Sequence, residues 1–467
     1  MTREQIETRE DRDSLGAVRV PVDRYWGAQT ERARRNFPPG TELMPTVFIR
    51  ALGMQKQAAA RANAASGALD AKRAKAIELA ASDVVAGKLD DHFPLPVWQS
   101  GSGTQYNMNA NEVIANRAGE SLGAALGSYA AVHPNDHVNM AQSSNDTIPT
   151  VMNLAALMAW RDAGALALDD LIHEVEGCAS RFAGLVKVGR THLQDAVPMT
   201  LGQEFSAFSA QLGAARETLS GALNSLLAVP QGGTAVGTGL NAPADFGPAF
   251  ARELSALSGF NFTSADNKFA KIAGHQDLFS VSAALSGLAT VLYKLANDVR
   301  LLGSGPRAGL GELILPKNEP GSSIMAGKVN PSQAEAMTMV CVRVFGNHDT
   351  VTHAAAGGQF QLNAYKPVII YAVLQSVILL GQAMASFTAR CLKGLKADEA
   401  RLSANVAHSL MVATALVPHI GYDKTAEIVL KADHEGTGLR EAALALQALS
   451  AADYDKWVDP LAMTKGG

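Results

Sequence analysis

Four stretches rich in small polar residues interrupt an otherwise alanine-rich, apolar sequence, and they hold most of the side chains suited to catalysis or ligand binding. The local pattern places each at a helix start or in a loop between helices, where backbone N–H groups are unpaired and the helix dipole favours anions. Such places suit carboxylates. The stretches are WQSGSGTQYNMNANEV at 98–113, VHPNDHVNMAQSSNDT at 132–147, GRTHLQDAVPMTLGQEF at 189–205 and PGSSIMAGKVNPSQAEA at 320–336.

Any one of these stretches, taken alone, is more simply explained as helix capping, because Ser, Thr and Asn before a helix usually satisfy its unpaired backbone groups. Four together favour a site for a small, multiply charged anion that is held by many hydrogen bonds. The chain has no Cys/His spacing typical of a metal centre. We therefore expect no metal ion.

The stretch at 320–336 has the composition of a loop that closes over a substrate. Its glycines indicate mobility, and we expect a new helix to begin at Asn330-Pro331. Lys328 supplies the positive charge within the stretch, and Ser322 or Ser323 could act as a nucleophile or base. The alternative is a flexible glycine linker with an exposed lysine.

Two further motifs allow a functional and a structural interpretation. His192 lies in the polar run RTHLQD, just before an apolar helical stretch, and is a candidate acid or base for a reaction that adds or removes water; a structural histidine is the alternative. The glycine-rich run GGTAVGTGLNAP at 232–243 follows helical sequence and lacks the downstream acidic residue of a dinucleotide site. We expect it to form a tight turn between helices, with backbone donors.

The elements that must position these motifs are mainly α-helices. Strand patterns are sparse, as at 17–22, whereas alanine-rich helical segments dominate. Composition shifts near 133–146 and 395–402 divide the chain into three regions. They are an N-terminal mixed, mostly helical domain at 1–140, a central helical bundle at 141–399 and a small C-terminal helical domain at 400–467.

Several helix-length segments are nearly free of charge and apolar around most of their circumference. A single bundle cannot cover every face of such helices, so we expect several subunits to pack bundle against bundle; one large monomeric bundle is the alternative. The segment at 368–389 is long enough to span a membrane. Its glutamines and small residues, and the absence of an aromatic belt or a lopsided basic flank, favour a buried helix instead.

The overall charge excludes binding that depends on a basic field. The 467 residues include 40 Lys and Arg against 44 Asp and Glu, so nucleic acid and anionic membranes are not expected partners. Three cysteines without a CxxC pair support neither a disulfide framework nor a thiolate zinc site, which favours a reducing compartment. The amino terminus MTREQIETREDRDSL lacks a secretion or transit signal, and we expect a cytoplasmic protein.

With these motifs in view, the sequence closely resembles the class II fumarases of the fumarase/aspartase superfamily, nearly from end to end. The loop GSSIMAGKVNP at 321–331 matches the superfamily signature, and SGSGTQ, HPND, QSSNDT, THLQDA, GYDKTAEIV and WVDP fit as well. The resemblance implies a three-region, mainly helical homotetramer whose central bundles join into one core and whose active sites draw on three subunits. His192, where aspartases usually carry Gln, favours a fumarase over an ammonia-lyase. A protein that kept the fold and lost the activity is the remaining alternative.

The resemblance further implies reversible, stereospecific hydration of fumarate to (S)-malate, a tricarboxylic acid cycle reaction, by anti addition of water through an aci-carboxylate carbanion and without a cofactor. By the same resemblance, Ser322 is the base that takes the C3 proton of malate, His192 is the partner acid or base, and Glu335 supports activity by orienting His192. Small hydroxyls and amides place many donors around a compact dianion without adding bulk. The implied substrate contacts are Ser102, Gly103, Thr104, Ser143, Ser144, Asn145, Thr191, Ser323, Lys328, Val329 and Asn330.

A second dicarboxylate site, outside the active site, is implied at His133, Pro134, Asn135 and Asp136; a helix-start turn is the alternative. Relatives often carry a basic residue shortly before this motif, whereas this chain has alanine at 130 and 131. Ala326 also departs from the family, since fumarases commonly have Pro there. A freer backbone raises the entropy cost of closing the loop, so we predict weaker substrate capture.

Overall fold

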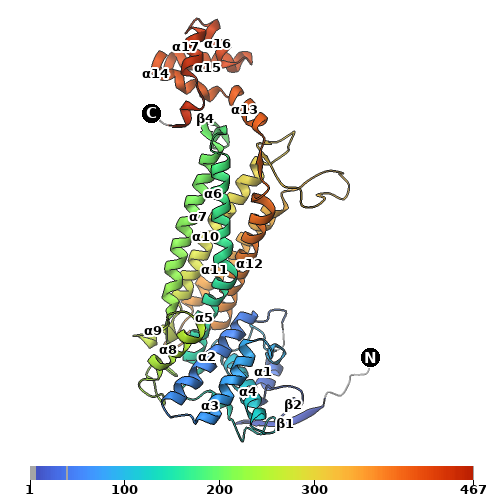
Figure 1. The fold of residues 1–467 in the computed structure, drawn as a ribbon, viewed down its shortest axis with the longest axis vertical. Coiled ribbons are helices and arrows are strands. Elements are labelled where there is room, and N and C mark those ends of the chain that lie inside the picture. The colour runs from blue at the N-terminus through green and yellow to red at the C-terminus, as the bar shows by residue number, and fades with distance from the viewer. Residues whose placement is uncertain (1–6, 38–39, 466–467) are drawn as a thin grey trace. The chain divides into compact units, whose positions relative to one another are not determined.

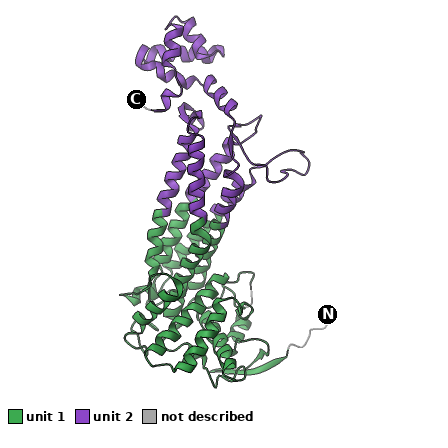
Figure 2. Cartoon of the chain, viewed as in Figure 1, with its two compact units in different colours: residues 1–166, 217–289, 342–381 green, residues 167–216, 290–341, 382–467 purple. Residues whose placement is uncertain are grey.

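The computed structural model describes residues 7–37 and 40–465, and within this range the chain is mainly helical, as predicted. It forms two compact units, each built from three segments (Figure 2). Unit 1 comprises the residues up to 166 with 217–289 and 342–381; unit 2 comprises 167–216, 290–341 and the residues from 382 onward. The three predicted regions divide the chain differently and stay a prediction; their ends, 1–6 and 466–467, lie outside the described residues.

The helices and strands are labelled in Figure 1. The α-helices are α1 (Ala28–Asn36), α2 (Thr46–Ala65), α3 (Ala71–Val85), α4 (Thr104–Ser121), α5 (Ser144–Ala159), α6 (Leu166–Arg181), α7 (Leu201–Asn224), α8 (Phe246–Ser258), α9 (Lys268–Ala273), α10 (Gln276–Leu302), α11 (Ser332–Ala356), α12 (Lys366–Phe387), α13 (Glu399–His408), α14 (Val417–Ile420), α15 (Tyr422–Glu435), α16 (Leu439–Ala445) and α17 (Ala451–Trp457). Short 3₁₀ and π segments are η1 (Asp90–His92), η2 (Pro134–Val138), η3 (Trp160–Ala165), η4 (Ser225–Leu227), η5 (Thr388–Leu392), η6 (Leu410–Leu416) and η7 (Ala462–Lys465). The strands are β1 (Thr8–Asp13), β2 (Gly16–Pro21), β3 (Val186–Thr191), β4 (Gln194–Thr200), β5 (Ala228–Val229), β6 (Thr263–Ser264), β7 (Leu313–Ile314) and β8 (Lys396–Ala397).

The strands pair two by two. β1 and β2 form an antiparallel hairpin that includes the predicted run at 17–22, whereas β5 and β6 make a short parallel pair. β3 and β4 form a second hairpin, so the first part of the stretch at 189–205 is not the predicted loop, whereas its last part is a helix start, since α7 begins at Leu201. This hairpin was not predicted because its two turn residues are His192 and Leu193. Gly and Asn are the residues that normally indicate such a turn.

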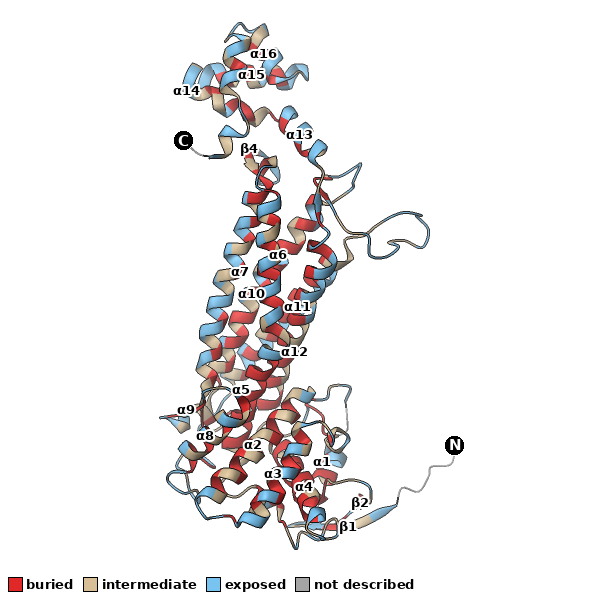
Figure 3. Cartoon of the chain, in the orientation of Figure 1, coloured by how far each residue is buried: buried red, intermediate tan, exposed pale blue. Residues whose placement is uncertain are grey.

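Small residues let the helices of unit 1 approach closely. A side chain built at Gly53 of α2 would lie 3.0 Å from Val84 of α3, and α5 is buried without interruption from Asp146 to Ala159 (Figure 3). Polar contacts join the parts of α10, α11 and α12 that belong to this unit: Ser282 Oγ of α10 lies 3.1 Å from His348 Nδ1 of α11, and Asn347 Nδ2 of α11 lies 3.0 Å from Ser376 Oγ of α12. The alanine-rich composition thus serves close helix packing.

Two apolar segments, Gln276–Leu302 and Lys366–Leu392, are long enough to cross a membrane by length and composition. This is weak support for a membrane span, because core helices of soluble proteins pass the same test. Only 50% and 56% of their most apolar windows are buried by the chain itself. The predicted buried helix at 368–389 lies within the second of these segments, so the chain itself buries only about half of that window.

Unit 2 combines helix pairs with a C-terminal helical cluster. Ser209 of α7 donates to Glu176 of α6 at 3.3 Å, and the ammonium of Lys294 on α10 lies 5.4 Å from the Phe208 ring centroid. The C-terminal cluster has its own apolar core, with Leu416 and Ile428 fully buried. The three cysteines are free and buried, and burial raises their thiol pKa values to about 11 for Cys178 and about 12 for both Cys341 and Cys391.

Candidate active site

In unit 1, the loop before α4 presents a row of hydroxyl groups. Ser102 Oγ lies 2.8 Å from Thr104 Oγ1 and 2.9 Å from Ser100 Oγ. Gly103 caps α4 in a left-handed conformation at φ 72° and packs against Ile148 of α5, where an added Cβ would lie 3.1 Å from a methyl carbon. Glycine is required here, since another residue would be strained and crowded. Gly103 has no side chain to cap this helix start, and the Thr104 N–H donates to Ser102 Oγ at 3.4 Å, so amide and hydroxyl donors gather at the start of α4.

The start of α5 is held by a buried carboxylate. Ser143 is the N-cap: its Oγ accepts from the Asn145 N–H at 3.2 Å, and its own N–H donates to Asp146 at 2.9 Å. Asp146 also accepts from the backbone of Gly232 at 3.0 Å and Thr234 at 2.9 Å. Burial raises the pKa of Asp146 to about 7, although these bonds oppose the rise. The predicted glycine-rich turn at 232–243 is thus a turn that donates from its backbone to the helix bearing the Ser-Ser-Asn motif.

A polar network that the sequence interpretation missed joins these two helix starts. Lys56 of α2 is fully buried and donates to Asn107, Gln142 and Asn139 at 2.7, 2.9 and 3.2 Å. Asn107 in turn donates to Ser144 Oγ at 3.2 Å. Burial lowers the pKa of Lys56 to about 7, against the opposing charge of Asp146. The sequence feature that could have indicated this network is Lys56 itself, a charged residue within the apolar, alanine-rich run of α2.

The HPND motif forms the start of η2. His133 Nδ1 accepts from the backbone of Asn135 at 3.3 Å and Asp136 at 3.2 Å, which is the geometry of the structural alternative, a helix-start turn. The second dicarboxylate site stays a prediction. Arg73 of α3 donates to the Ala131 carbonyl at 2.8 Å and thus brings a guanidinium beside the segment that lacks a basic residue of its own.

In unit 2, His192 lies at the tip of the β3–β4 hairpin. His192 and Leu193 both adopt left-handed conformations, at φ 56° and 60°, as a type I′ turn requires, and the side chain of His192 is exposed. Thr191 is the last residue of β3 and pairs with Gln194. The histidine is therefore the first residue of an exposed turn between the two strands.

A buried ionic network holds that hairpin. Glu312, whose side chain is 0% exposed, pairs with Arg190 and lies 3.4 Å from Lys187, both on β3. Lys187 also contacts Glu204 of α7 at 2.7 Å, and Asn405 of α13 donates to Glu312 at 3.0 Å. Burial alone would raise the pKa of Glu312, but the bond from Arg190 and the charge of Lys187 lower it below its ordinary value. Sequence reasoning missed this network, because its members lie far apart in the chain.

The loop at 321–331 surrounds the Ser322 hydroxyl with backbone donors. Ser322 Oγ accepts from the N–H groups of Ile324 at 3.2 Å and Met325 at 2.9 Å. The Lys328 ammonium donates to Asn330 Oδ1 at 2.7 Å and keeps further donors. The adjacent Ser323 is exposed.

The base of the loop is closed by hydrogen bonds. The Gly321 N–H donates to the Lys328 carbonyl at 2.9 Å, and the Asn330 side-chain amide donates to the Gly321 carbonyl at 2.6 Å. Val329 lies in the sequence between Lys328 and Asn330. α11 begins at Ser332, as predicted from Asn330-Pro331, and Glu335 is exposed in its first turn.

The structure thus assembles the predicted site residues in two groups, one in each unit. Ser102, Gly103, Thr104, Ser143, Ser144 and Asn145 lie in unit 1, whereas Thr191, His192, Ser322, Ser323, Lys328, Val329, Asn330 and Glu335 lie in unit 2. Within the described part of unit 2, no hydrogen bond or ion pair joins Glu335 to His192, so the predicted orienting contact is untested. Across residues 7–37 and 40–465, no three His, Cys, Asp or Glu side chains group as metal ligands do.

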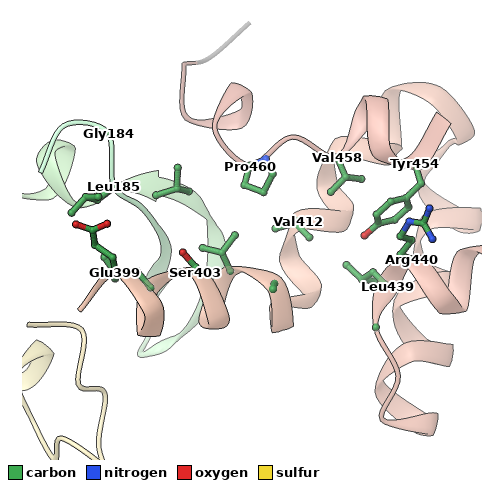
Figure 4. Close-up of a pocket in the computed structure, with 15 residues that line it drawn as sticks. Gly184, Leu185, Glu399, Ser403, Val412, Leu439, Arg440, Tyr454, Val458 and Pro460 are labelled. Carbon is green, nitrogen blue, oxygen red and sulfur yellow. The ribbon is translucent and has the colours of Figure 1, made fainter. Parts of the chain in front are cut away.

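Unit 2 also contains a cavity of about 540 Å³ between the start of β3, α13 and the C-terminal helices (Figure 4). Its lining is largely aliphatic and includes Leu402 and Val406 of α13 together with Val412 and Val458. None of the predicted site residues lines it. The polar surfaces described above therefore remain the better candidates for binding a dicarboxylate.

Comparisons with known proteins place the chain in a family. Residues 16–346 match the family described as Lyase, and residues 412–465 match the family described as Fumarase C C-terminus. The chain is 54% identical to fumarate hydratase class II 2 of Bradyrhizobium diazoefficiens over 98% of this chain and 97% of that protein, and 54% identical to fumarate hydratase class II of Thermosynechococcus vestitus over 97% of each.

The structure superimposes on class II fumarase from Schistosoma mansoni with a TM-score of 0.96 and 41% identity, covering 98% of this chain and 99% of the other. The mainly α fumarase/aspartase fold is thereby confirmed, and so is the resemblance on which the sequence interpretation rested. The chain belongs to the class II fumarase family of carbon–oxygen lyases.

Proposed function

We propose that this chain hydrates fumarate reversibly to (S)-malate, by anti addition of water through an aci-carboxylate carbanion, as an enzyme of the tricarboxylic acid cycle. The full-length likeness to named fumarate hydratases supports the reaction. Of the geometric observations, the pair of backbone donors on Ser322 Oγ carries the proposal furthest.

Ser322 acts as the base that removes the C3 proton of malate. A serine hydroxyl is a weak base at neutral pH and must be stabilised in its deprotonated form. The N–H groups of Ile324 and Met325 point at Ser322 Oγ and would stabilise the charge of an alkoxide there. In the hydration direction the same serine returns the proton to C3.

His192 serves the opposite side of the reaction, where the C2 hydroxyl leaves with a proton as water. Its exposed position on the turn leaves the imidazole free to face substrate, and Glu335 is proposed to orient it. Removal of the C3 proton concentrates two negative charges on one carboxylate. The ammonium of Lys328, the amide of Asn330 and the start of α4 offer the donors that such a charge requires.

Substrate binding draws on the two groups of site residues and on other subunits. We assign Ser102, Thr104, Ser143, Ser144 and Asn145 to the substrate carboxylates and leaving oxygen, with no cofactor. The half-covered apolar segments of α10 and α12, and the exposure of Met339 at 67% and Val342 at 58% on α11, support a second copy packing on these helices. A cytoplasmic homotetramer with sites shared among three subunits is the assembly we propose.

Ser322→Ala tests the mechanism. Malate dehydration, followed by the ultraviolet absorbance of fumarate, should lose roughly 10²- to 10⁴-fold in kcat, because the proton-transfer group is removed. Ser323→Ala is the matched comparison and should alter KM more than kcat, since Ser323 is assigned to binding. Near-normal turnover by Ser322→Ala would remove Ser322 from the role of base.

The wild-type protein should first be given (S)-malate and, separately, aspartate, both in chelator-treated buffer. Absorbance that rises with malate alone supports the fumarase. A rise with aspartate alone would indicate an ammonia-lyase, and no rise with either substrate would indicate a protein that kept the fold and lost this activity.

A further inference from the structure

Lys56 is a buried cation whose hydrogen-bond partners are all neutral. Its three N–H donors meet the side-chain oxygens of Asn107, Gln142 and Asn139, and its side chain is 0% exposed. Asp146 is near enough for its charge to favour the ammonium, but among the described residues no carboxylate forms an ion pair with Lys56. A buried charge in neutral surroundings is costly, so its presence beside a binding site calls for a functional explanation.

The ammonium fixes the orientation of the Asn107 amide. In its protonated form Lys56 only donates, and Asn107 accordingly turns its oxygen toward the ammonium and its nitrogen away. That nitrogen donates to Ser144 Oγ at 3.2 Å and to Asn139 Oδ1 at 3.1 Å. Because Ser144 Oγ is already an acceptor in this bond, its own O–H remains available to donate to a ligand.

We propose that Lys56 is a positioning residue for substrate: through Asn107 it makes the Ser144 hydroxyl a donor to a substrate carboxylate, and it adds positive charge beneath the start of α5. This inference rests on the proposed function, which assigns Ser144 to substrate. A dianionic substrate, and the more concentrated charge of the aci-carboxylate, gain from a cation in surroundings where water does not screen it.

Two variants separate this role from simple support of the fold. Asn107→Asp keeps an oxygen for Lys56 and gives the ammonium a counter-charge, so the protein should fold, but it loses the N–H donor to Ser144. Lys56→Met removes the charge itself. Each should raise KM for malate by about 10- to 100-fold with a smaller change in kcat, the size expected when a hydrogen bond to a charged group is lost. A purely structural defect would lower the active fraction, and hence apparent kcat, and leave KM unchanged.

A double-mutant cycle tests the route through Ser144. If Asn107 acts through Ser144, Asn107→Asp should cause little further loss in a Ser144→Ala background. Lys366→Met is the matched control, because Lys366 is equally buried but donates to the Ile272 carbonyl and to His275 instead. It should lower the unfolding temperature without raising KM. Additive effects in the cycle, an unchanged KM in Asn107→Asp, or an equal rise in Lys366→Met would overturn the proposal.

Wild-type activity distinguishes this proposal from the function on which it rests. If the wild type turns over malate and the cycle is additive, only the role of Lys56 fails. If the wild type is inactive, the proposed function fails, and calorimetric titration with the unreactive dicarboxylate succinate replaces KM in the same cycle. Equal succinate affinity in wild type and Asn107→Asp would then overturn the role of Lys56 as well.

Discussion

Replacing Ala326 by Pro should tighten substrate capture, because the loop already has the turn that proline favours. The Lys328 N–H donates to the Met325 carbonyl at 3.2 Å across a turn whose third residue, Gly327, has φ 79°. This is the pattern of a type II turn, in which Ala326 holds the position most favourable to proline. Among the described contacts Ala326 N–H donates no hydrogen bond, so proline removes none.

The magnitude follows from the entropy that proline removes from the open loop. A compatible substitution by proline is worth about 0.4 to 1 kcal/mol, which corresponds to a KM for malate lower by about 2- to 5-fold with kcat little changed. Steady-state kinetics measure KM, and hydrogen exchange of residues 321–331 measures loop order. Gly327→Ala is the opposite control, since a left-handed conformation costs other residues about 1 to 2 kcal/mol and should raise KM. If Ala326→Pro changed neither KM nor loop exchange, the argument from the turn would be wrong.

Three further outcomes follow from the hairpin. His192→Asn should reduce kcat by roughly 10²- to 10⁴-fold in the malate assay, and retained activity would contradict the role of His192. The unfolding temperature of this variant should be unchanged or higher, because asparagine suits a left-handed turn. Leu193→Gly should raise stability in denaturant titration by up to about 1 kcal/mol by relieving strain, and a loss of stability would contradict the strain assignment. Glu312→Gln should cost about 3 kcal/mol at pH 7, because Arg190 and Lys187 lose their buried counter-charge. Since the folded pKa of Glu312 is lowered, the stability that this carboxylate contributes is present above the ordinary glutamate pKa and is lost as pH falls through the folded pKa. The unfolding free energy of the Glu312→Gln variant should therefore fall less steeply at acidic pH than that of the wild type. An equally steep fall in both proteins would refute this argument.

The sequence predicts the helical class and the polar segments well because both are local properties. Alanine-rich periodicity indicates helices, and runs such as 98–113 mark helix starts by composition alone. The hairpin at His192 was missed because its strands carry mixed polar residues and its turn lacks glycine. Lys56 and Glu312 were not predicted for another reason. Their roles depend on partners more than fifty residues away along the chain, and local sequence patterns do not indicate such contacts.

Because its native cysteines are buried, this protein is suited to site-selective labelling at an introduced cysteine. Thiol reagents need an accessible thiolate, and all three native thiols are enclosed with raised pKa values. A single cysteine introduced at Ile324, which is 87% exposed beside Ser322, would be the preferred target of a maleimide dye. Fluorescence from that one position could then report in real time how the loop responds to a dicarboxylate, separately from the chemistry that turnover measures.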